Sequence, residues 1–321
     1  MRISKLLFVC LLFGCATSNS SFENDIKFVR AIPHENKVVI NAVSDDLKSI
    51  ETKDYDDLTI GLINDELTFK ENKLYTINYI NHKTNIIELD INTKEKTIIS
   101  NKDENPQVKT MIEDNIYYSS NYFENNYLIK QKIKSKDKVK KYFNNYFFNY
   151  LINYKNKIVA FVTNNSNHDF ILEIDKDTLR IISKRKIPSI NQNARPIIDN
   201  DFLYFISNNS LYINDLISKK NKIIKLTSSY PTNLKILNNK LYLNSINKLT
   251  MQSKSSKIEV IDLKKDKKEY LEADKIINNF IFKNNNVYLL HDNSISVYDL
   301  NFKKINEVNF DDNKINLEFL Q

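Results

Sequence analysis

The chain has 321 residues, a formal net charge of +7 and a mean hydropathy of −0.46. It contains two glycines, which excludes phosphate-binding loops that depend on several glycines. The positive charge comes mostly from lysines scattered among acidic residues, so a nucleic-acid partner is not expected.

The first residues have the layout of a secretory signal. Arg2 and Lys5 supply a short positive region, and residues 6–13 form an unbroken apolar run. This run is too short to span a bilayer as a helix. The segment therefore predicts an exported protein whose signal is removed.

The end of this signal resembles the lipobox of bacterial lipoproteins. Leu12, Gly14 and Cys15 match that motif, while Phe13 is larger than the usual residue. The resemblance implies cleavage after residue 14, with a diacylglycerol and usually an N-acyl chain on Cys15, which together hold a protein stably at a membrane. We therefore expect a signal peptide at 1–14, a lipidated polar tether at 15–24 and a folded domain at 25–321.

The predicted cleavage also limits the chemistry of cysteine. Cys10 and Cys15 are the two cysteines of the chain, and Cys10 would leave with the signal. The mature protein would keep Cys15, with lipid on its sulfur, so no disulfide and no cysteine-based metal site is expected. The alternative for the whole segment is an ordinary hydrophobic N-terminal strand or helix with a chance cysteine.

A short phrase recurs along the rest of the chain: a polar turn, then an aliphatic residue, then usually a tyrosine. Its seven copies begin 36 to 46 residues apart and occupy residues 36–39, 72–75, 114–117, 156–159, 201–204, 239–242 and 285–288. Asparagine tolerates the left-handed backbone region, so asparagine pairs between apolar runs are expected to form turns. Such pairs occur at 208–209, 238–239 and 284–285.

A second phrase follows each of the last six copies. An apolar run ends in a turn rich in aspartate and lysine, and another apolar run follows. In five copies the first run ends in an aspartate, at Asp90, Asp175, Asp215, Asp262 and Asp299. Each unit of roughly 42 residues thus indicates four short antiparallel strands, which is the pattern of a β-propeller blade.

Seven copies predict an all-β fold, a β-propeller with seven four-stranded blades. The first copy is incomplete near residues 46–56, and the chain ends with an alternating apolar run at 314–320. We expect this last run to pair into the first blade as a strand and to close the ring, which removes an open sheet edge. The alternatives are a six-bladed propeller, with the first copy as a lead-in segment, and another all-β fold.

The signal and the repeats together resemble the propeller lipoproteins of Gram-negative envelopes. The nearest analogy is the propeller subunit of the outer-membrane β-barrel assembly machinery, which is similar to quinoprotein-type repeat proteins. In that family the third strand ends in aspartate and a Thr-Gly turn follows. The repeat aspartates match, and Thr93 and Thr178 stand in the turn, but the family's glycine and its frequent tryptophan are absent.

The histidines fall at related positions of the repeat. His82, His168 and His291 precede the repeat aspartate by seven or eight residues, in the loop between the second and third strands. A metal-binding or pH-sensing cluster on one face would use such a placement. The units that contain them are mostly not adjacent, and no carboxylate recurs beside them. We therefore expect exposed loop histidines, and no metal, cofactor or catalytic site.

Residues 117–150 are unusually rich in aromatic residues interleaved with asparagines. Phe148 and Tyr150 are expected to be core residues of a strand. Five others fall in loops and connections on one face of two neighbouring blades, which is typical of a protein contact surface. These five are Tyr122, Phe123, Tyr142, Phe143 and Tyr146. The alternative is that they fold over the blade edge as core.

The sequence therefore predicts a lipid-tethered, monomeric propeller that binds other envelope proteins as a scaffold. By the resemblance, its expected location is the outer membrane and its specific role is outer-membrane protein assembly. An enzyme is not expected. The alternative is a propeller enzyme or ligand-binding protein that acts on an envelope substrate. Acids and a histidine at the channel mouth would favour that alternative, whereas an exposed aromatic or edge-strand groove would favour the scaffold.

Overall fold

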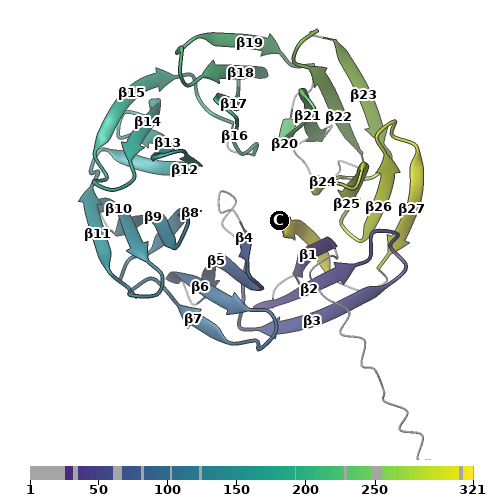
Figure 1. Cartoon of the computed structure of the whole chain (residues 1–321), viewed down its shortest axis with the longest axis horizontal. Coiled ribbons are helices and arrows are strands. Elements are labelled where there is room, and N and C mark those ends of the chain that lie inside the picture. Colours follow the sequence, from purple (N-terminus) through teal and green to yellow (C-terminus); the bar gives the residue numbers. More distant parts are fainter. Residues whose placement is uncertain are drawn as a thin grey trace, which may run out of the picture.

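The computed structural model describes residues 26–31, 35–60, 67–80, 83–101, 103–122, 125–191, 193–227, 230–246, 255–265, 267–310 and 314–320. Within these residues, 28 strands form seven four-stranded antiparallel sheets. Figure 1 shows the sheets arranged as blades around a central axis. The predicted seven-bladed β-propeller is confirmed, and the six-bladed alternative is wrong. No helix in this part of the chain is long and apolar enough to cross a membrane.

The strands of each blade are given from the innermost to the outermost. Blade 1 contains β28 (Ile315–Leu320), β1 (Ile26–Ala31), β2 (Lys37–Val43) and β3 (Ile50–Asp56). Blade 2 contains β4 (Thr68–Lys70), β5 (Lys73–Ile80), β6 (Lys83–Asp90) and β7 (Lys96–Ile98). Blade 3 contains β8 (Pro106–Ile112), β9 (Asn115–Tyr122), β10 (Asn125–Lys132) and β11 (Lys138–Tyr142).

The other four blades follow in chain order. Blade 4 contains β12 (Tyr146–Tyr154), β13 (Lys157–Asn164), β14 (Asp169–Asp175) and β15 (Ile181–Ile187). Blade 5 contains β16 (Ile197–Asp199), β17 (Phe202–Ser207), β18 (Ser210–Asp215) and β19 (Asn221–Lys225). Blade 6 contains β20 (Tyr230–Leu237), β21 (Lys240–Ile246), β22 (Ser256–Asp262) and β23 (Lys268–Ala273). Blade 7 contains β24 (Asn279–Lys283), β25 (Asn286–Leu290), β26 (Ser294–Asp299) and β27 (Lys304–Asn309).

The hydrophobic core lies between the blades. For example, Tyr117 and Leu128 of blade 3 pack in one buried cluster with Leu151 and Val162 of blade 4. A four-stranded sheet has two apolar faces, and each face becomes buried only when a neighbouring blade covers it. The ring therefore stabilises each blade through both of its neighbours.

The last strand closes the ring, as predicted. β28 pairs antiparallel with β1, and Phe319 lies opposite Phe28 in the register. The N-terminal part of the chain thus supplies the three outer strands of blade 1, and the C-terminal part supplies the innermost one (Figure 1). This arrangement joins the two ends of the propeller through one sheet.

The first copy of the repeat phrase has a different position from the other six. Copies at 72–75 and 285–288 begin the second strand of their blades, β5 and β25, whereas residues 36–39 begin β2, the third strand of blade 1. The sequence indicated that the first copy is incomplete, and the structure shows that it also begins a different strand of its blade. The cause is the closure, because blade 1 has its innermost strand at the other end of the chain.

The repeat aspartates have a structural role in the turn between the third and fourth strands. Each side chain accepts hydrogen bonds of 2.7–3.2 Å from two backbone N–H groups two to four residues later. These backbone bonds lower the pKa of Asp90 and Asp262. Aspartate commonly forms such turns by bonding to the following backbone. The turn geometry therefore explains the repeat signature without a ligand.

Residues other than glycine occupy the left-handed positions of the turns. The predicted asparagine pairs at 208–209, 238–239 and 284–285 all have positive φ, between 45° and 60°. The turns between the third and fourth strands also contain a positive φ, at the place where the resembling family has glycine. In this chain the position holds Lys94 (65°), Lys136 (60°), Leu179 (54°), Lys219 (62°) and Phe302 (61°).

We expect Lys136→Gly to stabilise the protein. A left-handed backbone costs a residue with a Cβ atom roughly 1–2 kcal/mol, and glycine's greater entropy in the unfolded chain offsets about half of the gain. The free energy of unfolding should therefore rise by about 0.5 kcal/mol, measured by denaturant titration. Lys134→Gly is the control, because Lys134 lies in the same turn and is not among the residues with positive φ. A loss of stability in both variants would contradict the explanation.

Candidate functional site

The innermost strands of the seven blades surround a central channel. β4, β8, β12, β16, β20, β24 and β28 all contribute to its wall, and the cavity has a volume of about 780 Å³. Threonine and asparagine side chains form much of the lining, including Thr110, Thr232 and Asn279. Such side chains offer hydrogen bonds to a polar ligand or to water.

Charged groups in the channel come from three residues of the described lining. Arg195 and Lys235 are the cations, Glu318 is the one carboxylate, and no histidine lines this part of the cavity. Burial raises the pKa of Tyr150 to about 12, although the charge of Arg195 acts in the opposite direction. The Tyr150 phenol is therefore protonated at neutral pH. The described lining offers binding groups, but no acid-histidine cluster at the channel mouth.

Two buried glutamates outside the channel connect neighbouring elements. Glu104 accepts hydrogen bonds from the Tyr118 hydroxyl at 2.6 Å and from Lys138 Nζ at 2.9 Å. Glu173 accepts one from Lys157 Nζ at 2.8 Å and another from Lys219. Burial alone would raise the pKa of each carboxyl, but these hydrogen bonds outweigh it and lower the pKa. Both glutamates therefore stay ionised as structural partners of lysine. Among the described residues, no group of three or more histidine, cysteine or acidic side chains could hold a metal ion.

The histidines share the predicted loop but not the predicted exposure. His168 is exposed between β13 and β14, whereas His291, between β25 and β26, is 3% exposed. The prediction of an exposed side chain is wrong for His291, because its loop packs against the closing strand. The backbone N–H of Asn316 in β28 donates to the Asp292 carbonyl at 2.9 Å. The histidines at positions 34 and 82 lie outside the described residues.

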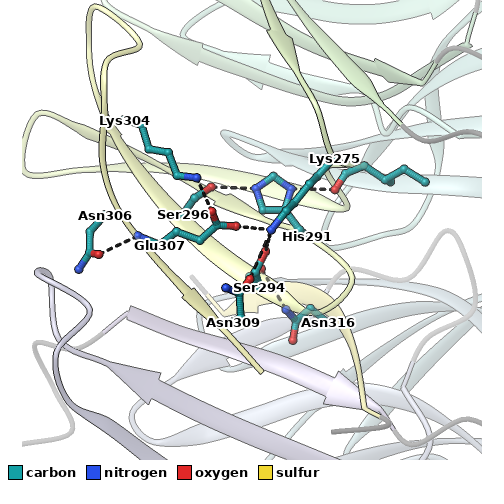
Figure 2. Close-up of polar contacts among 10 residues, drawn as sticks. Lys275, His291, Ser294, Ser296, Lys304, Asn306, Glu307, Asn309 and Asn316 are labelled. Carbon is teal, nitrogen blue, oxygen red and sulfur yellow. Dashed lines mark hydrogen bonds and ion pairs between the residues drawn. The ribbon is translucent and has the colours of Figure 1, made fainter. Parts of the chain in front are cut away.

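Figure 2 shows His291 held inside a polar network of blade 7. Its Nδ1 lies 2.8 Å from the Ile276 carbonyl oxygen, and its Nε2 lies 2.8 Å from the Ser296 hydroxyl. Because a carbonyl can only accept, we assign the proton to Nδ1 and let Ser296 donate to Nε2. Lys275 and Glu307 form an ion pair beside this ring. The network joins the end of blade 7 to the closing strand.

We expect His291 to destabilise the fold at mildly acidic pH. Burial lowers the pKa of His291, although the Ile276 backbone bond and the charge of Glu307 favour the protonated form, and Lys275 opposes it. Below the ordinary histidine pKa of 6.5, the unfolded chain binds a proton that the folded chain resists, so stability falls as the pH falls. The melting temperature should therefore decrease from pH 7.5 to 5.0 more steeply in the wild type than in His291→Gln. Parallel pH profiles of the two proteins would contradict this.

The aromatic residues of the predicted contact surface have different environments. Tyr142 is 46% exposed, and its ring lies 4.7 Å from the ring of Tyr127. Tyr146 is half-buried against Phe170. Phe143, by contrast, is 5% exposed and belongs to the core between blades 3 and 4. Phe143 is therefore a core residue, which was the alternative to its expected place in the contact surface.

Four other aromatic residues had predicted environments: Tyr122 and Phe123 in the contact surface, and Phe148 and Tyr150 in the core. Tyr122 ends β9, with a side chain outside the described part, and Phe123 lies outside the described residues. The Tyr142 hydroxyl donates a hydrogen bond to Asn125, the first residue of β10, so the start of β10 and the β11–β12 connection lie at the same end of blade 3. Phe148 and Tyr150 are buried in β12 as predicted, with exposures of 4% and 1%.

A hollow of about 360 Å³ lies on the outer rim between blades 3 and 4. One wall is the connection from β11 to β12, with Tyr142 and Tyr146, and the other is the start of β15, with Arg180 and Ile181. Ile181 is 43% exposed, and Arg180 is exposed as well. Sequence reasoning found the first wall through its aromatic density and missed the second, which lies about 35 residues further along the chain. We call this site the rim hollow.

Comparisons with known proteins find likeness at the level of structure. No protein-family model matches the chain, and no curated protein matches it. BamB from Moraxella catarrhalis is 12% identical over 87% of each chain, with a TM-score of 0.56. A proposed 6-phosphogluconolactonase from Bacteroides fragilis is 10% identical, over 94% of this chain and 99% of that one, with a TM-score of 0.63.

A third structure shows how widely the fold recurs. A protein from Lactobacillus plantarum is 7% identical, over 92% of this chain and all of that one, with a TM-score of 0.61. At these identities the likeness concerns the fold, since propellers host many unrelated functions. The chain is a seven-bladed β-propeller similar in fold to BamB and to the Bacteroides fragilis protein.

Proposed function

We propose that the protein is a lipid-tethered propeller that binds other proteins of the bacterial envelope as a scaffold. The lipid would be attached to Cys15, and the outer membrane is the proposed location. Outer-membrane protein assembly is the specific role that we propose. It is supported by the resemblance of the repeats to the propeller subunit of that assembly machinery and by the similarity in fold to BamB.

The observation that supports protein binding best is the distribution of exposed apolar side chains. Eight of the thirteen large hydrophobic side chains that are exposed in the described residues belong to the stretch from β11 to β19. These eight are Val139, Tyr142, Phe147, Ile181, Ile182, Phe202, Ile217 and Ile223. Grouped apolar side chains with polar neighbours are typical of protein interaction sites. Five of the eight lie on the outermost strands β11, β15 and β19, so this part of the rim favours a scaffold.

A second candidate function is the binding of a polar, anionic ligand in the channel, with or without catalysis. Its support is the 780 Å³ cavity with Arg195 and Lys235 in the wall. A cavity of this size can enclose a drug-sized molecule. Exposed aromatic side chains beside an edge strand were expected to favour a scaffold over a ligand-binding protein. Protein binding therefore remains the first proposal.

Two measurements in the native bacterium test the proposal. Cys15→Ser should abolish incorporation of a labelled fatty acid, and equal labelling of wild type and variant would overturn the lipid anchor. A photo-crosslinking amino acid in place of Tyr142 should trap an envelope protein. The matched control position is Ile305, which is 57% exposed on β27 of blade 7. Equal products from both positions, or none from either, would contradict the scaffold.

A further inference from the structure

The outermost strands of the blades differ strongly in charge around the ring. β11, β15 and β19 contain eight lysine or arginine residues and no acidic residue. The outermost strands of the other four blades, β3, β7, β23 and β27, contain four lysines and six acidic residues. Lysines on an edge strand commonly serve to prevent aggregation. Charged side chains of either sign can fill that role, so it does not explain why the outermost strands of three neighbouring blades lack acids.

We call β11, β15, β19 and Arg180, which directly precedes β15, the basic rim. Several of its cations have no carboxylate partner in the described part of the chain. Lys138 is paired with Glu104, and Lys184 lies over the ring of Phe170 at 4.2 Å. No ion pair joins Lys141, Arg180 or Lys186 to another described residue. Lys141 and Arg180 both line the rim hollow. The hollow thus combines an aromatic and aliphatic wall with two available positive charges.

The backbone at this place favours a polypeptide as the occupant. β15 is the outermost strand of blade 4 and has seven residues, and it pairs with β14 along one edge. An extended peptide can add to such an open edge through main-chain hydrogen bonds, while its alternate side chains enter pockets beside the strand. Ile181 and Ile182, 43% and 50% exposed, offer apolar contacts at the start of β15. A peptide with acidic residues would also match the charge of the rim.

The membrane that holds the proposed lipid is a less suitable partner for the basic rim than a peptide is. The proposed tether joins the propeller at β1, and blades 4 and 5 lie across the ring from blade 1 (Figure 1). Ten tether residues reach at most about 36 Å. The path from β1 to β15 crosses four strand spacings of about 4.8 Å each, as well as the channel, so the tether would have to be almost fully extended. A membrane held by the proposed lipid would therefore meet the basic rim only with the tether almost fully extended.

We propose that the rim hollow binds an extended acidic segment of a partner protein. The segment adds to the open edge of β15, places one apolar side chain between Tyr146 and Ile181, and sets its carboxylates beside Lys141 and Arg180. This inference rests on the protein-binding function proposed above and names the chemistry of the partner.

Fluorescent ten-residue peptides test the proposal by anisotropy with the full chain. One peptide alternates glutamate with leucine or phenylalanine, and its matched control has glutamine in place of glutamate. The acidic peptide should bind at least tenfold more tightly than the neutral one. Its affinity should fall several-fold between 50 and 300 mM salt, because exposed charge pairs are screened. Equal affinities for the two peptides would overturn the proposal.

Two charge-matched double variants locate the binding site. Arg180→Glu with Ile181→Asp should weaken the acidic peptide at least tenfold. Lys303→Glu with Ile305→Asp makes the same change on blade 7, where both residues are exposed, and should leave the affinity unchanged. Thermal melting verifies that both variants fold. If the first does not, Lys141→Glu replaces it, since Lys141 is exposed. Equal loss in both double variants would overturn the assignment to the rim hollow.

Two further outcomes separate this inference from the proposed function. If soluble short-chain phosphatidylglycerol displaces the peptide more effectively than unlabelled acidic peptide does, the rim is a lipid-headgroup surface and the inference is wrong. If position 142 crosslinks to an envelope protein but no acidic peptide binds, the scaffold stands and the inference fails. If position 142 gives no crosslink at all, the scaffold itself fails.

Discussion

Deletion of residues 314–321 is expected to unfold the propeller or to cause its aggregation. β28 is the innermost strand of blade 1, and without it β1 loses its inner partner. Phe319 and Leu320, 3% and 7% exposed, would leave the core, and Phe28, now 0% exposed, would face solvent. Burial of such side chains contributes about 1.5–3 kcal/mol each. The total is comparable with the 5–15 kcal/mol by which domains are usually stable.

The polar contacts of the closing strand add to this loss. The Asn278 side chain donates to the Asn316 carbonyl at 2.7 Å, and the Arg30 guanidinium donates to the Lys314 carbonyl at 3.3 Å. These contacts join β28 to the connection before blade 7 and to β1. Thermal melting and size-exclusion chromatography measure the outcome, with Phe319→Ala as a milder companion. A truncated protein that melts at the wild-type temperature would show that the ring closes without this strand.

The repeat made most of the fold predictable from sequence. Second strands begin after polar turns such as Asn72-Lys73, and third strands end at aspartates such as Asp175, so local turn chemistry marks the strand boundaries within each blade. The first copy differs from the others because the closure shifts blade 1 by one strand. A local phrase records a turn between two strands, and it does not record which strand of the sheet follows.

The side-chain environments were less predictable, because they depend on packing between distant segments. His168 and His291 occupy the same loop of the repeat, yet only the loop of blade 7 meets the closing strand. The rim hollow likewise needs Tyr142 of blade 3 and Ile181 of blade 4, which lie on opposite sides of one blade boundary. The positive charge beside the rim hollow could have been noticed in the sequence, since β11, β15 and β19 contain no acidic residue. Recognising these three strands as neighbours, however, requires knowing which strand of each blade is the outermost.

Phe143→Ala is expected to cost roughly 3–5 kcal/mol of unfolding free energy, the usual range for a buried phenylalanine. The Phe143 ring lies 5.3 Å from the ring of Phe148, in the core cluster that includes Leu179. Its backbone N–H also donates to the Asn126 carbonyl at 2.7 Å. This bond fixes the backbone, which therefore cannot easily move to fill the cavity that a smaller side chain would leave. Denaturant titration measures the loss.

Tyr142→Ala is the matched control for Phe143→Ala, because it removes the neighbouring aromatic ring from the surface. Tyr142 is 46% exposed, so its truncation should cost about 1 kcal/mol or less. The two variants thus separate the core from the contact surface within one dipeptide. Phe143→Ala should lose much of its stability, whereas Tyr142→Ala should keep most of it and lose crosslinking to the partner from nearby rim positions. Similar stability of the two variants would place Phe143 outside the core and return it to the contact surface.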